Sequence, residues 1–84
     1  MSEKQKLLIV DDSELNRDIL KEILGSSYDY LEAENGTQAI QILEVHPEID
    51  LMLLDINMPQ MNGFQVLEHM REFQWIDEVP VVMI

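Results

Sequence analysis

The chain has 84 residues, of which 46% are hydrophobic, with no cysteine and a formal net charge of −12. This length allows one domain or part of one, and the apolar content is typical of a globular chain rather than a disordered one. The lack of cysteine excludes disulfides and thiolate metal sites, and it agrees with the cytoplasmic location that we expect.

Charge and apolar patterning also limit the partners of this segment. A strongly acidic surface repels nucleic acid phosphates, so we expect no direct contact with nucleic acid. Residues 2–6 are polar or charged, unlike a signal peptide. No apolar run approaches the roughly 20 residues that a membrane-spanning helix needs, so we expect no membrane association.

The first part of the chain predicts a strand, a helix and a second strand. Residues 7–10 are continuously apolar, which suits a strand buried on both faces of a parallel sheet. The next segment predicts a helix that Ser13 caps and Gly25 ends. Its apolar stripe consists of Leu15, Ile19, Leu20, Ile23 and Leu24. Residues 28–33 are mixed in polarity and predict a strand nearer the edge of the sheet.

The rest of the chain continues this alternation. A second helix begins near Asn35 and Gly36 and ends before Pro47. Residues 51–54 predict a third buried strand, and residues 79–84 predict a fourth. The apolar stripe of the second helix consists of Ala39, Ile40 and Leu43. A third helix is predicted by a further apolar stripe, which consists of Phe64, Val66, Leu67, Met70 and Phe73. Strands that alternate with helices predict an α/β fold with a parallel sheet and right-handed crossovers.

Acidic residues directly follow two of the predicted strands. Asp11 and Asp12 follow residues 7–10, and Asp55 follows residues 51–54. Ligands of open parallel sheets bind beyond the carboxyl ends of the strands, so the three carboxylates converge if these strands are neighbours. Their repulsion makes full ionisation costly, and a divalent cation removes that cost. Magnesium prefers such oxygen ligands, whereas zinc favours His or Cys, so the pattern predicts a magnesium site.

A carboxylate beside such a metal can also act as a nucleophile. Aspartate forms aspartyl phosphates in some enzymes, and the metal would screen the incoming phosphoryl group. After Asp55, Pro59 stiffens a short loop and Gly63 permits a tight entry into the third helix. Each acid taken alone also fits a turn or a helix cap, so the joint pattern carries the prediction.

These residues resemble the receiver domain of two-component response regulators. The matching stretches are residues 8–12, residues 33–36 with Ala39, and residues 50–63, which read DLMLLDINMPQMNG. The last stretch is the most specific, because a proline and a glycine follow the acid at the positions that this family uses. The resemblance covers essentially the whole chain. It implies a flavodoxin-like doubly wound parallel sheet of strand order 2-1-3-4-5.

The resemblance also implies a role for each site residue. Asp55 would be the phosphoacceptor, Asp12 a direct Mg²⁺ ligand, and Asp11 an acid that acts mainly through water. Asn57 would offer its backbone carbonyl to the metal, while Pro59 and Gly63 would shape the loop. The donor would be a phosphohistidine on a histidine kinase or a phosphotransfer protein.

The chain stops earlier than receivers of this family do. The family's Ser or Thr after the fourth strand, its Lys after the fifth strand, that strand itself and two helices have no counterpart up to Ile84. We therefore expect residues 1–84 to be a receiver domain incomplete at its C-terminus, with strand order 2-1-3-4. Impaired phosphorylation of the fragment and self-association through its open fourth strand follow from this expectation.

Two other functions remain open from the sequence. A truncated receiver could act only as a non-catalytic interaction or oligomerising module, although Asp11, Asp12 and Asp55 are all retained. A phosphatase with an aspartate nucleophile would need a second acid two residues after it, and Asn57 holds that position. Magnesium binding and acceptance of phosphate from a small donor separate a signalling receiver from an inactive module.

Overall fold

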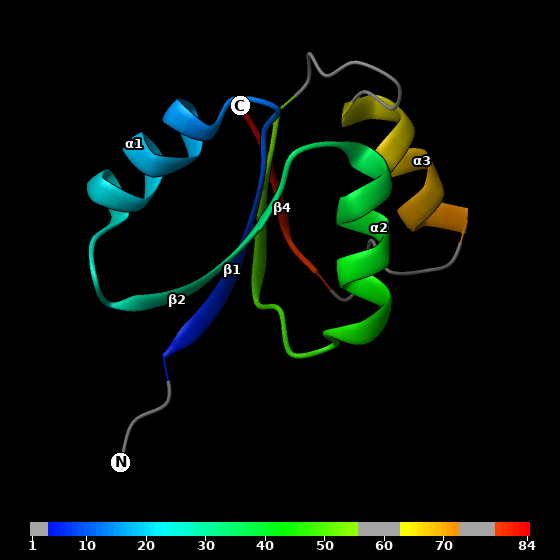
Figure 1. The fold of residues 1–84 in the computed structure, drawn as a ribbon. Helices are drawn as coiled ribbons and strands as arrows, with labels where there is room; N and C mark the ends of the chain where they lie inside the picture. The colour runs from blue at the N-terminus through cyan, green and yellow to red at the C-terminus, as the bar shows by residue number, and fades with distance from the viewer. Residues whose placement is uncertain (1–3, 56–62, 73–78) are drawn as a thin grey trace.

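A computed structural model describes residues 4–55, 63–72 and 79–84, and the chain alternates between strands and helices as the sequence predicts (Figure 1). No helix in these ranges is long and apolar enough to cross a bilayer. The elements are β1 (Gln5–Val10), α1 (Glu14–Leu24), β2 (Tyr28–Ala33), α2 (Gly36–Val45), β3 (Leu51–Leu54), α3 (Gly63–Glu72) and β4 (Val81–Met83).

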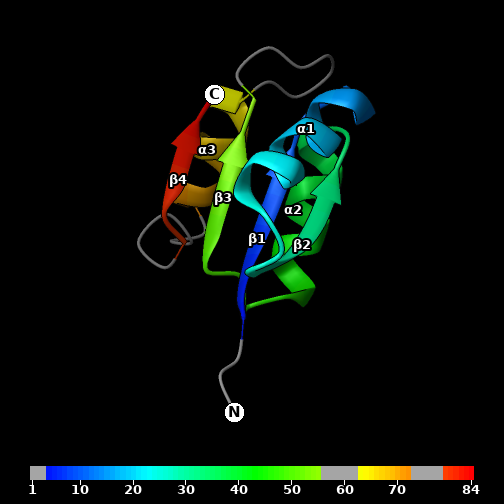
Figure 2. The ribbon, with the colours of Figure 1, turned by 90° about the vertical axis from the view of Figure 1, so that its left-hand side faces the viewer.

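The four strands form one parallel sheet in the order β2-β1-β3-β4, which confirms the predicted order (Figure 2). β1 pairs with both β2 and β3, so that Val10 lies beside Ala33 on one side and Leu54 on the other. Because β1 and β3 are neighbours and run in the same direction, the residues that follow them meet at one edge of the sheet.

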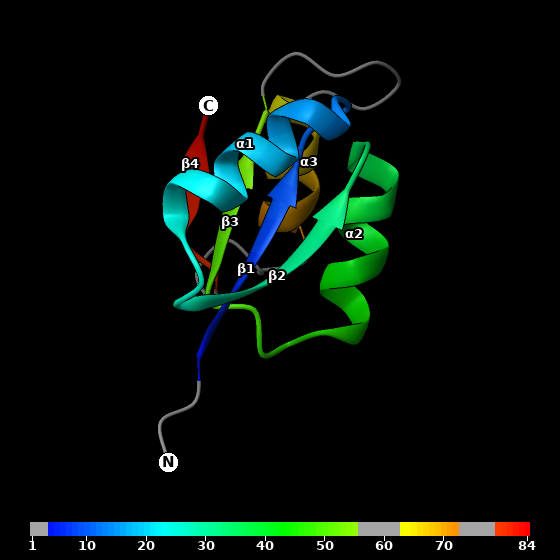
Figure 3. The same cartoon turned by 60° about the vertical axis from the view of Figure 1, so that its left-hand side comes forward.

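The main core lies between the sheet and the pair α2 and α3, while α1 covers the opposite face (Figures 1 and 3). Alternate strand residues point to the same face, so Leu8 and Val10 of β1 and Met52 and Leu54 of β3 enter this core together. All four are fully buried. Burial of each such side chain stabilises the fold by about 1.5–3 kcal/mol.

Local signals set the helix ends where the sequence predicts them. The Ser13 hydroxyl accepts a hydrogen bond from the Asn16 N–H at 3.3 Å, which caps α1. Gly25 ends that helix at φ 85°, a conformation that a residue with a Cβ rarely adopts. Asn35 caps α2 through its side-chain oxygen, which accepts from the Gln38 N–H at 2.8 Å.

The apolar stripe of α1 is more exposed than an amphipathic pattern predicts. No residue of α1 is buried, and Leu15 and Ile23 are 68% and 73% exposed. Within the described ranges α1 is the only helix on its face of the sheet, so its stripe has little to pack against (Figure 3). Val82, which β4 carries toward the same face, is 45% exposed for the same reason.

Two further predictions about the second half need correction. On α3 Val66 and Met70 are buried in the core and Leu67 packs against it, as predicted, whereas Phe64 is 62% exposed. Phe73 lies outside the described residues. The last strand covers Val81–Met83 rather than residues 79–84, and it lies at the edge of the described sheet. Pro80 has no N–H to donate to a ladder, which explains the later start of the strand.

Candidate functional site

The three acids of the predicted site lie together at the carboxyl edge of the sheet, where β1 and β3 end. The backbone N–H of Asp55 donates to the carbonyl of Val10 at 2.9 Å, and that of Asp11 donates to the carbonyl of Ala33 at 3.0 Å. These bonds continue the strand ladders past the ends of the strands. One carboxylate oxygen from each of Asp11, Asp12 and Asp55 lies within 4.8 Å of the others.

Asp11 is the buried member of this cluster, at 5% exposure. Burial raises the pKa of its carboxyl above the ordinary value, and the charges of Asp55 and Asp12 raise it further. Hydrogen bonds from the Ser13 N–H, at 2.9 Å to Oδ1, and from the Asn16 side chain act in the opposite direction. A cation beside Asp11 would offset the repulsion from these neighbouring carboxylates.

Asp12 is exposed and Asp55 is half-buried, so two of the three acids are accessible to solvent.

The donor set fits magnesium. Three carboxylates supply hard oxygen atoms without any nitrogen or sulfur ligand, and magnesium is commonly held by one or two carboxylates plus waters. Adjacent oxygens around Mg²⁺ lie about 3 Å apart and opposite ones about 4 Å, given bonds of 2.0–2.1 Å. The three carboxylate oxygens lie within 4.8 Å of one another, close enough for these residues to share one cation.

The remaining predicted site residues lie in or beside the segment after β3. Asn57 and Pro59 are outside the described residues, and Gly63 is the first residue of α3. The backbone ligand role of Asn57 and the loop-shaping roles of Pro59 and Gly63 stay predictions.

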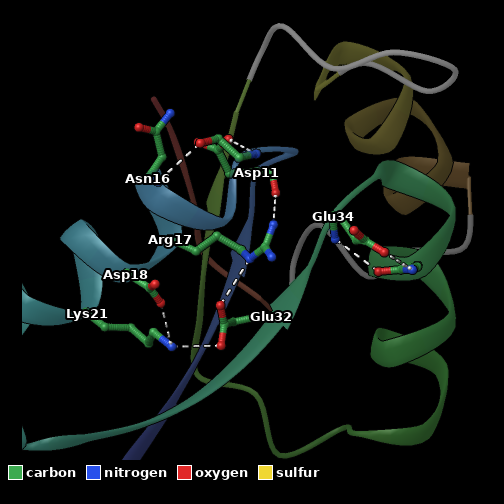
Figure 4. Close-up of polar contacts among 9 residues, drawn as sticks. Asp11, Asn16, Arg17, Asp18, Lys21, Glu32 and Glu34 are labelled. Atoms are coloured by element: carbon green, nitrogen blue, oxygen red, sulfur yellow. Dashed lines mark hydrogen bonds and ion pairs between the residues drawn. The ribbon is translucent and has the colours of Figure 1, made fainter.

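One basic residue at this site, Arg17, was not predicted from the sequence. Arg17 of α1 donates from Nη1 to the backbone carbonyl of Asp11 at 2.6 Å and from Nε to Oε1 of Glu32 at 3.0 Å (Figure 4). Arg17 and Glu32 are 15 residues apart and belong to no spacing motif. The pair could have been predicted only from the arrangement of the elements, in which β2 lies beside β1 and α1 packs on β2.

Comparisons with known proteins agree with this geometry. A family model described as the response regulator receiver domain matches residues 7–84. The chemotaxis protein CheY1 of Helicobacter pylori is 38% identical over 81 residues, covering 94% of this chain and 65% of that protein. A probable cyclic di-GMP phosphodiesterase of Vibrio cholerae is 37% identical over 78 residues, covering 93% of this chain and 18% of that protein. The chain thus spans 62–65% of the length of the chemotaxis relatives.

Solved structures share the fold. The Vibrio cholerae chemotaxis protein CheY4 superposes with a TM-score of 0.85 at 28% identity, over 96% of this chain and 68% of that one. A CheY-like receiver domain protein from Methanospirillum hungatei gives a TM-score of 0.85 at 29% identity, over 96% and 64% of the two chains. The parallel sheet of order 2-1-3-4 and the family match over residues 7–84 lead to one conclusion. This chain belongs to the receiver domain family of two-component response regulators.

Proposed function

We propose that this receiver accepts a phosphoryl group on Asp55, with Mg²⁺ held beside it by Asp11 and Asp12. The observation that carries the proposal is the convergence of one oxygen from each acid within 4.8 Å at the carboxyl edge of the sheet. Receiver domains take phosphoryl groups from histidine kinases or phosphotransfer proteins, so the donor proposed here is a phosphohistidine on such a partner.

The proposed reaction is a phosphoryl transfer to Asp55. A carboxylate oxygen of Asp55 attacks the phosphorus of the phosphoimidazole, and an O–P bond forms as the P–N bond breaks. The imidazole nitrogen of the donor keeps the electron pair and takes up a proton. The product is an acyl phosphate on Asp55.

Asp55 stays in place for this attack because its backbone N–H is bonded to the carbonyl of Val10. The exposed Asp12 would be a direct ligand of the metal, and the buried Asp11 would act mainly through water. Asn57 would add its backbone carbonyl. When bound, Mg²⁺ would screen the charge between the acids and the phosphoryl oxygens. The exposure of the cluster on the side of Asp12 leaves room for the donor's phosphoryl group.

The experiment that tests the proposal is labelling of the protein by a small phosphodonor in the presence of Mg²⁺. We expect one hydroxylamine-labile phosphoryl group, and we expect Asp55→Asn to abolish it, because the amide is nearly isosteric and a poor nucleophile. Asp50→Asn is a matched control, since Asp50 lies at the opposite end of β3 and its Oδ2 accepts from the Lys6 N–H at 2.8 Å. A label that persists in Asp55→Asn, or that resists hydroxylamine, contradicts the proposal.

A further inference from the structure

Arg17 connects the acidic site to the neighbouring strand β2. Its guanidinium uses two separate donors: Nη1 bonds the carbonyl of Asp11 at 2.6 Å, and Nε bonds Oε1 of Glu32 at 3.0 Å (Figure 4). The Arg17 side chain is 11% exposed and that of Glu32 is 34% exposed, so the guanidinium end of this bridge is shielded from water and the carboxylate end is partly solvated. The bond to the Asp11 carbonyl is partly buried and charge-assisted, and such a bond is stronger than one between neutral groups, so it restrains that carbonyl.

Glu32 is itself held in place from a second side. Lys21 Nζ lies 2.8 Å from Oε2 of Glu32 and 3.3 Å from Oδ1 of Asp18. The two oxygens of Glu32 therefore each meet a different cation from α1. Lys21 and, to a lesser degree, Arg17 lower the pKa of Glu32, so this anchor stays ionised.

These contacts restrict the backbone at the point where the metal ligands begin. The N–H of Asp11 is bonded to Ala33, its side chain accepts from the Ser13 N–H, and its carbonyl accepts from Arg17. The peptide unit between Asp11 and Asp12 is planar, so a fixed carbonyl at Asp11 also fixes the plane that leads into Asp12. Asp12 is exposed, so the backbone rather than packing sets its position.

We propose that Arg17, anchored on Glu32, is a positioning residue that preorganises Asp11 and Asp12 for the divalent cation. This inference rests on the function proposed above. The planar fork of an arginine can bond a carbonyl and a carboxylate together, whereas the single ammonium of a lysine is a point charge. Without the bridge, the Asp11–Asp12 peptide must become ordered when the metal binds. The conformational entropy lost in that step weakens the affinity for Mg²⁺. Partners of this outer kind typically change metal affinity by about 10–100-fold.

The test compares Mg²⁺ affinity in Arg17→Met and Lys21→Met by calorimetry and by the NMR shifts of the Asp11 and Asp12 amides. Both variants remove one positive charge and one ion pair with Glu32, but Arg17 alone contacts Asp11. Loss of a nearby cation by itself favours binding of another cation. Electrostatics therefore predicts unchanged or tighter binding in both variants. Positioning predicts at least about 10-fold weaker binding in Arg17→Met alone.

Changes at Glu32 keep the test decisive if Arg17→Met folds poorly. Glu32→Ala and Glu32→Gln remove the same negative charge, which by itself weakens cation binding equally in both. Only Gln keeps an oxygen for Arg17 Nε, so positioning predicts tighter Mg²⁺ binding in Glu32→Gln than in Glu32→Ala. Faster hydrogen exchange at the Asp12 amide should accompany each loss. Thermal melts of each variant without metal measure how much the substitution destabilises the fold itself.

The outcomes separate the two proposals. A wild-type protein that binds no Mg²⁺ contradicts the proposed function. Equal Mg²⁺ affinity in the wild-type protein and Arg17→Met overturns the positioning role of Arg17 and leaves the proposed function standing. If Arg17→Met does not fold, equal affinity in Glu32→Ala and Glu32→Gln overturns it in the same way. Mg²⁺ binding that is weakened equally in Lys21→Met also overturns the positioning role, because the effect would then come from the lost ion pair with Glu32 and not from the contact with Asp11.

Discussion

The backbone N–H of Asp55 donates a hydrogen bond to the carbonyl of Val10 at 2.9 Å, one residue before the acidic pair Asp11 and Asp12. The proposed phosphoacceptor is thus attached to the strand that carries the proposed metal ligands. The bond extends the register in which Val10 lies beside Leu54. The separation of the acids therefore depends on the sheet and not on a flexible loop.

Removal of the exposed ligand should weaken metal binding. We expect Asp12→Ala to lower Mg²⁺ affinity strongly, because one of the three converging carboxylates is lost and few ligands come from the protein. Titration calorimetry or NMR shifts measure the change, with Asp50→Ala as an acidic control remote from the cluster. Unchanged affinity in Asp12→Ala would show that the metal site is assigned wrongly.

The two faces of the sheet should respond differently to the same truncation. Leu8 is fully buried between β1 and the α2 and α3 layer, so Leu8→Ala should destabilise the protein by about 2–5 kcal/mol. Leu15 of α1 is 68% exposed, and Leu15→Ala should change stability by no more than about 0.5 kcal/mol. Urea denaturation measures both. A large loss of stability in Leu15→Ala would mean that the apolar stripe of α1 is covered in the protein in solution.

Glu48 should titrate far below an ordinary glutamate. A hydrogen bond with the His46 side chain, at 2.9 Å from Nδ1, and the Lys6 ammonium at 3.0 Å lower the pKa of Glu48 to about 2. A lowered carboxyl pKa contributes stability above the unfolded value of about 4.5, and that contribution is lost as the pH falls toward about 2.

NMR titration of the Glu48 carboxyl carbon checks this expectation. His46→Ala should raise the pKa of Glu48 more than Lys6→Met does, because the His46 bond is the larger cause. An ordinary pKa in the wild-type protein, or no response to His46→Ala, would contradict the proposed pairing.

The outer strand should make residues 1–84 associate when they are produced alone. β4 is at the edge of the described sheet, and Val82 and Ile84 are 45% and 44% exposed. Open apolar edges recruit other strands, so light scattering should show a mass that rises with concentration. Val82→Lys should reduce this association, since charge on an edge strand opposes pairing. A concentration-independent monomer would show that this sheet edge does not associate.

Local signals in the sequence determined the elements of this protein. Apolar runs, helical stripes, the caps at Ser13 and Asn35 and the glycine at position 25 act over a few residues, so they identify a strand or a helix end without the rest of the fold. The acids after β1 and β3 were visible for the same reason, because each directly follows an apolar run.

The tertiary structure decided which of these pieces meet, and only the family resemblance, not the local patterns, predicted the strand order. Asp11 and Asp55 converge because β1 and β3 are adjacent, and neither strand's pattern contains that adjacency. The exposure of Leu15 on α1 and of Phe64 on α3 depends on what covers each helix, which periodicity does not specify. The Arg17–Glu32 bridge joins residues from different elements, and side-chain pairs of this kind exist only once α1 is packed on β2.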